Sequence, residues 1–162
     1  MSLDRSRSMG HQVNWAARLF ARDMDRRLKP LGLSSSQLPV LLALAAYQTL
    51  SQKGLVARSS VEQPAMARML DRMEREGLVS KKPDPLDGRA YLYSLTEKSQ
   101  SKLPAISDAM SHGNEHALHG ITQEEIVIVL KTLARINQNL ADPDVLPPYP
   151  PQSNPGNPAD LD

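Results

Sequence analysis

The segment from Glu62 to Leu95 constrains the fold more than any other part of the chain. Four apolar side chains in its first half recur at spacings of three and four residues: Met66, Met69, Leu70 and Met73. This spacing predicts an amphipathic helix whose methionines belong to the core, and Gly77 is a typical residue for its end. Residues 78–82 and 89–95 then have the pattern of β-strands, with 83–88 as the turn between them. A helix that leads directly into a hairpin is compatible with few small folds.

Further helices are predicted on both sides of that segment. The first is expected over residues 11–29, and the second begins near Ser35 or Ser36 and carries Leu38, Leu41, Leu42 and Ala45 on one face. The others are expected at 51–58, from Thr96 to about His119, and from Thr122 to Leu140. The last helix is expected to bury one apolar face: Ile126, Val129, Leu130, Leu133, Ile136 and Leu140. The predicted fold class is mostly α with a small two- or three-stranded antiparallel sheet. Two short helices followed by a hairpin predict a winged helix-turn-helix.

Charge is unevenly distributed along the 162 residues, although the formal net charge is only +1. From Lys53 to Lys102 there are ten Lys or Arg against seven Asp or Glu, whereas residues 141–162 contain four Asp and no Lys or Arg. A basic middle is compatible with a polyanionic partner. The same terminal residues hold seven of the thirteen prolines, so an extended or disordered acidic tail is expected there.

Composition and pattern exclude several classes of protein. The chain has no cysteine, which rules out disulfides, zinc-cysteine sites and thiol redox sensing. The N-terminal residues lack the apolar region of a signal peptide, and no apolar stretch approaches the length of a membrane span. We therefore expect a cytoplasmic protein with no membrane partner. No nucleophile is paired with a base and no phosphate-binding glycine loop occurs, so an enzyme is not expected.

The helix of residues 62–76 has a second face that can carry chemistry. Arg68 and Pro64 point away from the methionines, and Ala65 and Arg72 lie on a flank. Such a helix can enter a DNA major groove, where arginine pairs with guanine and glutamine with adenine. Arg68 and Gln63 are therefore candidate base contacts, and Arg72, Lys53 and Ser51 are candidate phosphate contacts. The alternative is a solvated face of ion pairs between these arginines and the neighbouring acids.

Residues 70–99, LDRMEREGLVSKKPDPLDGRAYLYSLTEKS, resemble the MarR family of winged-helix transcriptional regulators, in order and without gaps. Looser similarity extends upstream through LSSSQLPVLLAL (33–44) and LSQKGLVARSSVEQPAMARML (50–70). Downstream, NEHALHGITQEE (114–125) resembles the link between the family's last two helices. The resemblance covers roughly residues 10–140.

The resemblance implies a homodimer that binds double-stranded DNA at a palindromic operator, with the role of a repressor. Residues 1–32 and 97–140 would form a helical dimerisation region, residues 33–96 the winged helix-turn-helix DNA-binding lobe, and 141–162 a tail outside the family pattern. In the family the wing arginine of an Asp-x-Arg motif enters the minor groove and the aspartate orients it. These positions are Asp87 and Arg89, and Lys81 and Lys82 at the wing base would attract phosphate. One departure is Ala65, where the family often has Ser or Thr.

MarR-like regulators commonly release DNA when a small aromatic or phenolic acid binds, which makes a small-molecule effector an expected partner. The candidate pocket residues are Trp15, Arg18, Leu19 and Tyr47, with Arg18 as the carboxylate partner. The alternative is that Trp15 and Tyr47 are ordinary residues of an amphipathic core.

Three histidines, His112, His116 and His119, are spaced for one helical face and are candidate zinc ligands. Near a helix C-terminus, histidines more commonly bind carbonyl oxygens, so neither a metal nor another cofactor is expected. The predicted function is therefore an effector-released DNA-binding repressor. Two alternatives stay open, a winged-helix protein-interaction module and a metal-responsive regulator that uses the histidines.

Overall fold

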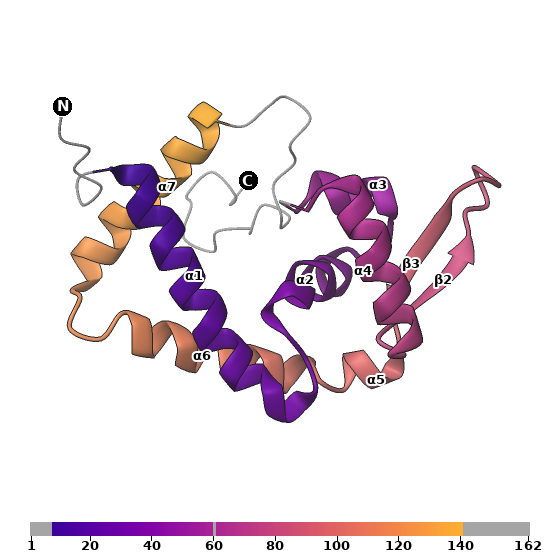
Figure 1. Ribbon diagram of the computed structural model, residues 1–162, viewed down its shortest axis with the longest axis horizontal. Coiled ribbons are helices and arrows are strands. Elements are labelled where there is room, and N and C mark those ends of the chain that lie inside the picture. Colours follow the sequence, from indigo (N-terminus) through magenta and orange to yellow (C-terminus); the bar gives the residue numbers. More distant parts are fainter. Residues whose placement is uncertain (1–7, 60, 141–162) are drawn as a thin grey trace, which may run out of the picture. The chain divides into compact units, whose positions relative to one another are not determined.

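The computed structural model describes residues 8–59 and 61–140 of the chain (Figure 1). The predicted acidic tail therefore lies outside the described residues. The elements, in chain order, are α1 (Met9–Leu28), η2 (Lys29–Leu31), η3 (Ser35–Gln37), α2 (Leu38–Tyr47), β1 (Thr49–Ser51), α3 (Gln52–Ala57), α4 (Gln63–Arg75), β2 (Val79–Pro83), β3 (Tyr91–Leu95), α5 (Glu97–Gln100), α6 (Leu103–Ala117) and α7 (Gln123–Leu140). The predicted fold class, mostly helical with a small antiparallel sheet, is confirmed.

The described chain divides into two compact units. One unit contains residues 8–38 together with Ser101–Leu140, and the other contains Pro39–Gln100. The roles predicted for the two regions, dimerisation and DNA binding, stay predictions.

The sheet of the second unit has three strands in the order β1-β3-β2, all antiparallel to their neighbours. β2 and β3 form the predicted hairpin, with Val79 opposite Leu95 and Pro83 opposite Tyr91. The helix predicted for residues 51–58 is present as α3, with Ser51 as its N-cap and Arg58 as its C-cap. The strand before it was not predicted, since Thr49–Ser51 pairs with β3. Gln48, with a φ of 63°, turns the backbone between α2 and this strand.

The core of the second unit forms under α4. Met66, Leu70 and Met73 have no exposed surface, which confirms that the methionine stripe is structural. Met69 is half-buried. The apolar side chains of the other elements that complete this core are Val40, Leu41, Ala43, Leu44, Leu55, Leu78, Val79, Tyr93 and Leu95. One face of α4 is thus used for folding, and its opposite face is left to solvent.

The predicted helix from Thr96 to His119 is broken in two. Thr96 caps its start as expected, because the backbone N–H of Ser99 donates to Thr96 Oγ1 at 3.3 Å. The helix ends after α5, however, and α6 begins at Leu103 with Pro104 in its first turn. Proline has no N–H to donate and its ring clashes with the preceding turn, so a helix restarts at proline more readily than it runs through it.

In the first unit α1 packs closely on α6 at Gly113. A Cβ at Gly113 would lie 3.3 Å from Met24 Cε, so glycine avoids a tight contact where the two helices meet. Leu28 and Ile106 are buried there, and Lys102 Nζ donates a hydrogen bond to the carbonyl oxygen of Leu31.

The last helix, α7, leaves much of its apolar face exposed among the described residues. Its capping box is present, since Thr122 N donates to Glu125 Oε2 at 2.8 Å and Glu125 N to Thr122 Oγ1 at 3.3 Å. Among the side chains predicted to be buried, Ile126, Leu133 and Ile136 are half-buried, and Val129, Leu130 and Leu140 are exposed. The prediction of a buried face is therefore wrong for these residues, because no element among residues 8–59 and 61–140 covers that side of α7.

None of the described helices is by itself long and apolar enough to span a membrane. Two consecutive segments, Met9–Leu31 and Ser35–Tyr47, are long and apolar enough for a span only when they are taken together, and the chain bends by 93° between them.

Candidate nucleic-acid interface

The outward face of α4 carries the residues predicted to contact bases. Gln63, Pro64, Arg68 and Arg72 are exposed, and Ala65 is half-buried. Pro64 lies in the first turn, where its missing N–H has no helical partner to lose. Because Met66, Leu70 and Met73 pack inward, this face is fixed by the core beneath it.

The two arginines of that face differ in their partners. Arg72 Nε lies 3.6 Å from Glu76 Oε1, one turn further along α4, which is the kind of surface ion pair that the alternative interpretation predicts. Arg68 is exposed and makes no ion pair in the described ranges. The guanidinium of Arg68 is therefore available to a ligand, and that of Arg72 is partly engaged.

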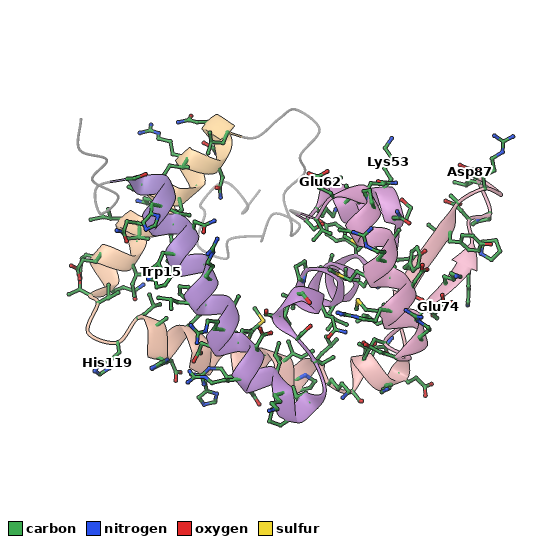
Figure 2. All side chains as sticks on the ribbon, in the orientation of Figure 1. Trp15, Lys53, Glu62, Glu74, Asp87 and His119 are labelled. Atoms are coloured by element: carbon green, nitrogen blue, oxygen red, sulfur yellow. The ribbon has the colours of Figure 1, made fainter. Side chains whose placement is uncertain are left out.

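Two of the predicted phosphate-contact residues, Ser51 and Lys53, lie at the start of α3. Ser51 is the N-cap of α3 and its Oγ accepts a hydrogen bond from Gly54 N at 3.1 Å, so this hydroxyl already has a structural role. Lys53 is exposed at the outer end of α3 (Figure 2). Gln52 Nε2 donates to the carbonyl oxygen of Gln63 at 3.4 Å. Gln52 was not a predicted site residue, and this bond ties α3 to the first turn of α4.

Two aspartates hold the wing turn through backbone hydrogen bonds. Asp87 Oδ1 accepts from the backbone N–H of Arg89 at 3.0 Å, and Asp84 Oδ1 accepts from that of Leu86 at 2.9 Å. Backbone bonds from Ala90 N to Asp87 O and from Asp84 N to Ala90 O, both 2.9 Å, close the turn. Asp87 lies at the tip of the hairpin (Figure 2). It thus orients Arg89 through the backbone, and the exposed guanidinium makes no ion pair within residues 8–59 and 61–140.

The two lysines of the wing base are not equivalent. Lys81 Nζ lies 2.8 Å from Glu74 Oε2 of α4 and 5.5 Å from the centroid of the Tyr91 ring. The hydrogen bond to Glu74 raises the pKa of Lys81 above its usual value. Lys82 is exposed. Lys81 is therefore a link between the wing and α4, whereas Lys82 is the better candidate for a phosphate contact.

The residues predicted for an effector pocket fall in different units. Trp15, Arg18 and Leu19 are exposed on α1. Tyr47, in the other unit, holds the guanidinium of Arg58 over its ring at 4.5 Å. Arg58 Nη1 also donates to the carbonyl oxygen of Gly54 at 3.2 Å, so Tyr47 has a structural partner.

A groove of about 640 Å³ lies within the first unit, on α1 and α6. Leu19 and several charged side chains line it, among them Arg22, Asp23, Arg26, Lys29 and His116. Asp23 accepts hydrogen bonds from Arg27 and Arg26, which lower its pKa. Asp25 also lines the groove, and its Oδ1 accepts the backbone N–H of Ser35 at 2.7 Å. The groove therefore carries charges of both signs, with Arg22 and Lys29 among its cations. Only Leu19 of the predicted pocket residues belongs to it.

The three histidines do not form a metal site. His112 Nδ1 is 2.8 Å from the carbonyl oxygen of Asp108, and His116 Nδ1 is 3.6 Å from Asp23 Oδ1. His119 lies beyond the end of α6 at Ala117, so the expected helical face is interrupted before it (Figure 2). Among the described residues, no group of three His, Cys, Asp or Glu side chains is arranged to hold a metal ion.

Several solved structures share this fold. A mutant MarR from E. coli complexed with operator DNA is 22% identical and superposes with a TM-score of 0.78, covering 84% of this chain and 99% of that one. A MarR family regulator from Listeria monocytogenes complexed with DNA is 25% identical, with a TM-score of 0.75 over 82% of this chain and 89% of that one. A ligand-free, organohalide-sensing transcriptional regulator is 22% identical, with a TM-score of 0.74 over 86% of each chain.

The sequence comparison agrees with the fold. Residues 31–90, which include α2, β1, α3, α4, β2 and the wing turn, match the MarR family. The same segment contains the outward face of α4 and the residues that fix the wing turn. Residues 31–90 are therefore similar to the MarR family of transcription regulators, and the described chain shares its fold with solved structures of that family.

Proposed function

We propose that this protein is a repressor that binds a palindromic DNA operator as a homodimer and is released by a small aromatic or phenolic effector. The observation that carries the proposal is the availability of two cations. Arg68 on α4 and Arg89 on the wing are exposed and have no ion-pair partner in the described chain. The core fixes α4 from behind, and hydrogen bonds fix the wing turn. These positions match the two places where a winged helix reaches DNA.

Each contact has a distinct role in this proposal. Arg68 pairs with the O6 and N7 of a guanine in the major groove, and Gln63 with an adenine. Lys53, Lys82 and Arg72 neutralise phosphates, which position the protein without reading sequence. Arg89 enters the adjacent minor groove, whose narrow form concentrates negative potential. Pro64 and Ala65 let the backbone of the first turn approach the bases, while Ser51 and Lys81 support the surface that makes these contacts.

The homodimer is supported by the uncovered apolar surface of the first unit. Ile128, Val129 and Leu130 of α7 are 62%, 53% and 61% exposed, and Phe20 of α1 is 44% exposed. Exposed apolar side chains of this kind mark an interaction site, and a second copy of the chain offers the same side chains in return. In this proposal residues 1–32 and 97–140 form the dimerisation region and 33–96 the DNA-binding lobe. Two such lobes would read half-sites about one helical turn apart.

Selection of DNA from a random pool tests DNA binding directly. We expect a palindrome, and a Kd that rises steeply with salt, with log K falling by about 0.9 per phosphate neutralised. Arg68→Ala and Arg89→Ala should each weaken operator binding by about tenfold or more, since one good base contact contributes roughly 1–3 kcal/mol. Arg75→Ala, on the last residue of the same helix, is the matched control and should have a smaller effect because the N-terminal residues lie nearest the bases.

The competing function is a protein-interaction module, and the same experiment separates the two. A flat salt response, or no enrichment of any palindrome, would reject DNA binding and favour that alternative. If Arg89→Ala binds the operator as tightly as the wild type, Arg89 of the wing is not part of the DNA interface, and α4 can still be part of it.

The effector site is proposed to be the groove on α1 and α6. Arg22 and Lys29 supply positive charge for a carboxylate, and Leu19 supplies an apolar wall. Trp15, the only tryptophan of the chain, lies one helical turn before Leu19 and reports binding there. Simple aromatic acids such as benzoate and salicylate should quench its fluorescence, and Arg22→Ala should weaken that binding by about tenfold or more.

Arg18→Ala is the matched control for Arg22→Ala. Arg18 lies one turn earlier on α1 and does not line the groove. A loss of binding in Arg18→Ala alone would place the effector where the sequence first predicted it. No quenching by any acid of a broad panel would argue against both positions.

A further inference from the structure

Leu86 occupies an unusual position at the turn of the wing. Its side chain is 95% exposed, more than any other large hydrophobic side chain in the described part of the protein. At this exposure the side chain buries almost no surface in the described part of the protein, so it contributes little to the stability of the fold. An exposed leucine on a thin hairpin is therefore best explained by something outside the chain.

The turn holds Leu86 in this exposed position. The backbone N–H of Leu86 donates to Asp84 Oδ1 at 2.9 Å, and Pro83 and Pro85 restrict the backbone before it. The bond from Asp84 N to Ala90 O closes the loop on the other side. The leucine is thus fixed in solvent by the same hydrogen bonds that shape the wing.

The charges around Leu86 indicate what it meets. Lys82 and Arg89 are exposed on either side of the turn. The carboxylates of Asp84 and Asp87 each accept a backbone hydrogen bond, so one oxygen of each is held against the turn. An apolar side chain between two cations matches a DNA minor groove, whose phosphates line the edges and whose sugars and base edges form the walls and floor.

We propose that Leu86 is an apolar minor-groove contact of the wing. Its side chain packs against deoxyribose and base edges beside Arg89 and wedges the groove open at one base step. This apolar contact adds to the DNA affinity of the wing by an amount that does not depend on salt concentration. It also makes the wing prefer base-pair steps that deform easily, such as TA or CA/TG. The inference rests on the proposed DNA binding and adds to it a residue that reads DNA shape.

The test compares three variants on the selected operator at several salt concentrations. Leu86→Ala should raise Kd by about 5- to 30-fold, as expected for loss of most of a buried leucine side chain, and by the same factor at every salt concentration. Leu86→Met keeps the apolar volume and should bind within about threefold of the wild type. Arg89→Ala should instead reduce the salt slope by about 0.9, because it removes a charge.

A second measurement tests the shape preference. Replacing the pyrimidine–purine step under the wing by a stiff AA step should weaken the wild type more than Leu86→Ala, which no longer wedges the groove. The wing turn itself is preserved in these leucine variants, because the hydrogen bond to Asp84 uses the backbone N–H of residue 86. Unfolding midpoints equal to that of the wild type would verify this.

The outcomes separate the inference from the proposed function. If the wild type binds an operator and Leu86→Ala binds it equally well, the inference is overturned and DNA binding stands. A loss that shrinks with rising salt, as for a charge, would overturn it as well. A wild type that binds no DNA would overturn both, and the leucine would then fit a protein partner.

Discussion

Gly77 determines at the scale of one residue where α4 ends. Its φ is +68°, a conformation that other residues adopt only with strain. Gly77 N donates to Glu74 O at 3.0 Å and Leu78 N to Met73 O at 2.8 Å, so the last carbonyls of the helix are satisfied. Leu78, only 2% exposed, is thereby directed into the core and the chain enters β2.

Gly77→Ala should lower the free energy of unfolding by about 1–2 kcal/mol, the typical penalty for an L-residue in the left-handed region. Steric overlap adds little, because the nearest side-chain atom to a new Cβ is Lys98 Cδ at 3.9 Å. Urea unfolding followed by circular dichroism measures the change. Gly10→Ala in α1, where nothing lies within 4 Å of the new Cβ, is the control and should be neutral or stabilising. Equal effects of the two substitutions would contradict this account.

Residue-level chemistry also shows what could be predicted of the site. Arg68 was predicted to point away from the core, since a helix of known period leaves little choice, and it is exposed in the structure. The engagement of Lys81 was not predicted, because its partner Glu74 comes from another element. The role of Ser51, whose hydroxyl caps α3, was not predicted either, because the strand before that helix was not predicted from the sequence.

At the scale of elements, Asp23 joins two arginines of its own helix, α1, and approaches His116 of α6. Its carboxylate accepts hydrogen bonds from Arg27, at 2.6 Å, and from Arg26 on its own helix. His116 of α6 lies 3.6 Å away and adds an ion pair when its imidazole is protonated. Gly113 allows this approach by leaving room for Met24.

Asp23→Asn should flatten the pH dependence of stability. The hydrogen bonds from Arg27 and Arg26 lower the pKa of Asp23 in the folded state, so the unfolded state takes up a proton first as the pH falls. The stabilisation by Asp23 is therefore complete above its unfolded pKa of about 4 and is lost as pH falls through the folded pKa. Urea midpoints between pH 7 and pH 3 measure it, with Asp25→Asn as the control. If the urea midpoints of the wild type and of Asp23→Asn fall equally steeply as the pH is lowered, the prediction is contradicted.

At the scale of the whole molecule, the exposed apolar side chains of α7 require a partner. The helix has good local signals, a capping box at Thr122 and a regular apolar period, and it forms as predicted. What it packs against was not predictable from its own residues, and Val129 and Leu130 are exposed in the part of the chain that the structure describes. The hypothesis of a homodimer gives this face the same surface on a second copy.

Leu130→Glu should dissociate the proposed dimer, because a charge at an apolar interface leaves its carboxylate without solvent. Sedimentation equilibrium should give twice the 17.9 kDa chain mass for the wild type and about one chain mass for the variant. Lys131→Glu makes a charge change at the next residue and should leave the dimer intact. Circular dichroism verifies that both variants stay helical. A Leu130→Glu protein that sediments as the wild type would exclude this face from the interface.

The sequence by itself determined the elements whose signals are local. The period of the methionines, the stop at Gly77 and the cap at Thr122 each involve residues within a few positions, and hydrogen bonds over that range form wherever the helix forms. The break before α6 follows from Pro104 and was also local, although the prediction passed over it.

Only the tertiary structure decided the contacts between distant segments. The strand Thr49–Ser51 is too short to show a period and exists because β3 offers it a hydrogen-bonding edge. The pairs Lys81–Glu74 and Arg58–Tyr47 likewise depend on how separate elements pack. Lys81 and Arg58 are engaged because the fold brings a partner within reach of each. Arg68 and Arg89 make no ion pair in the described chain, so their guanidinium groups stay available to a ligand.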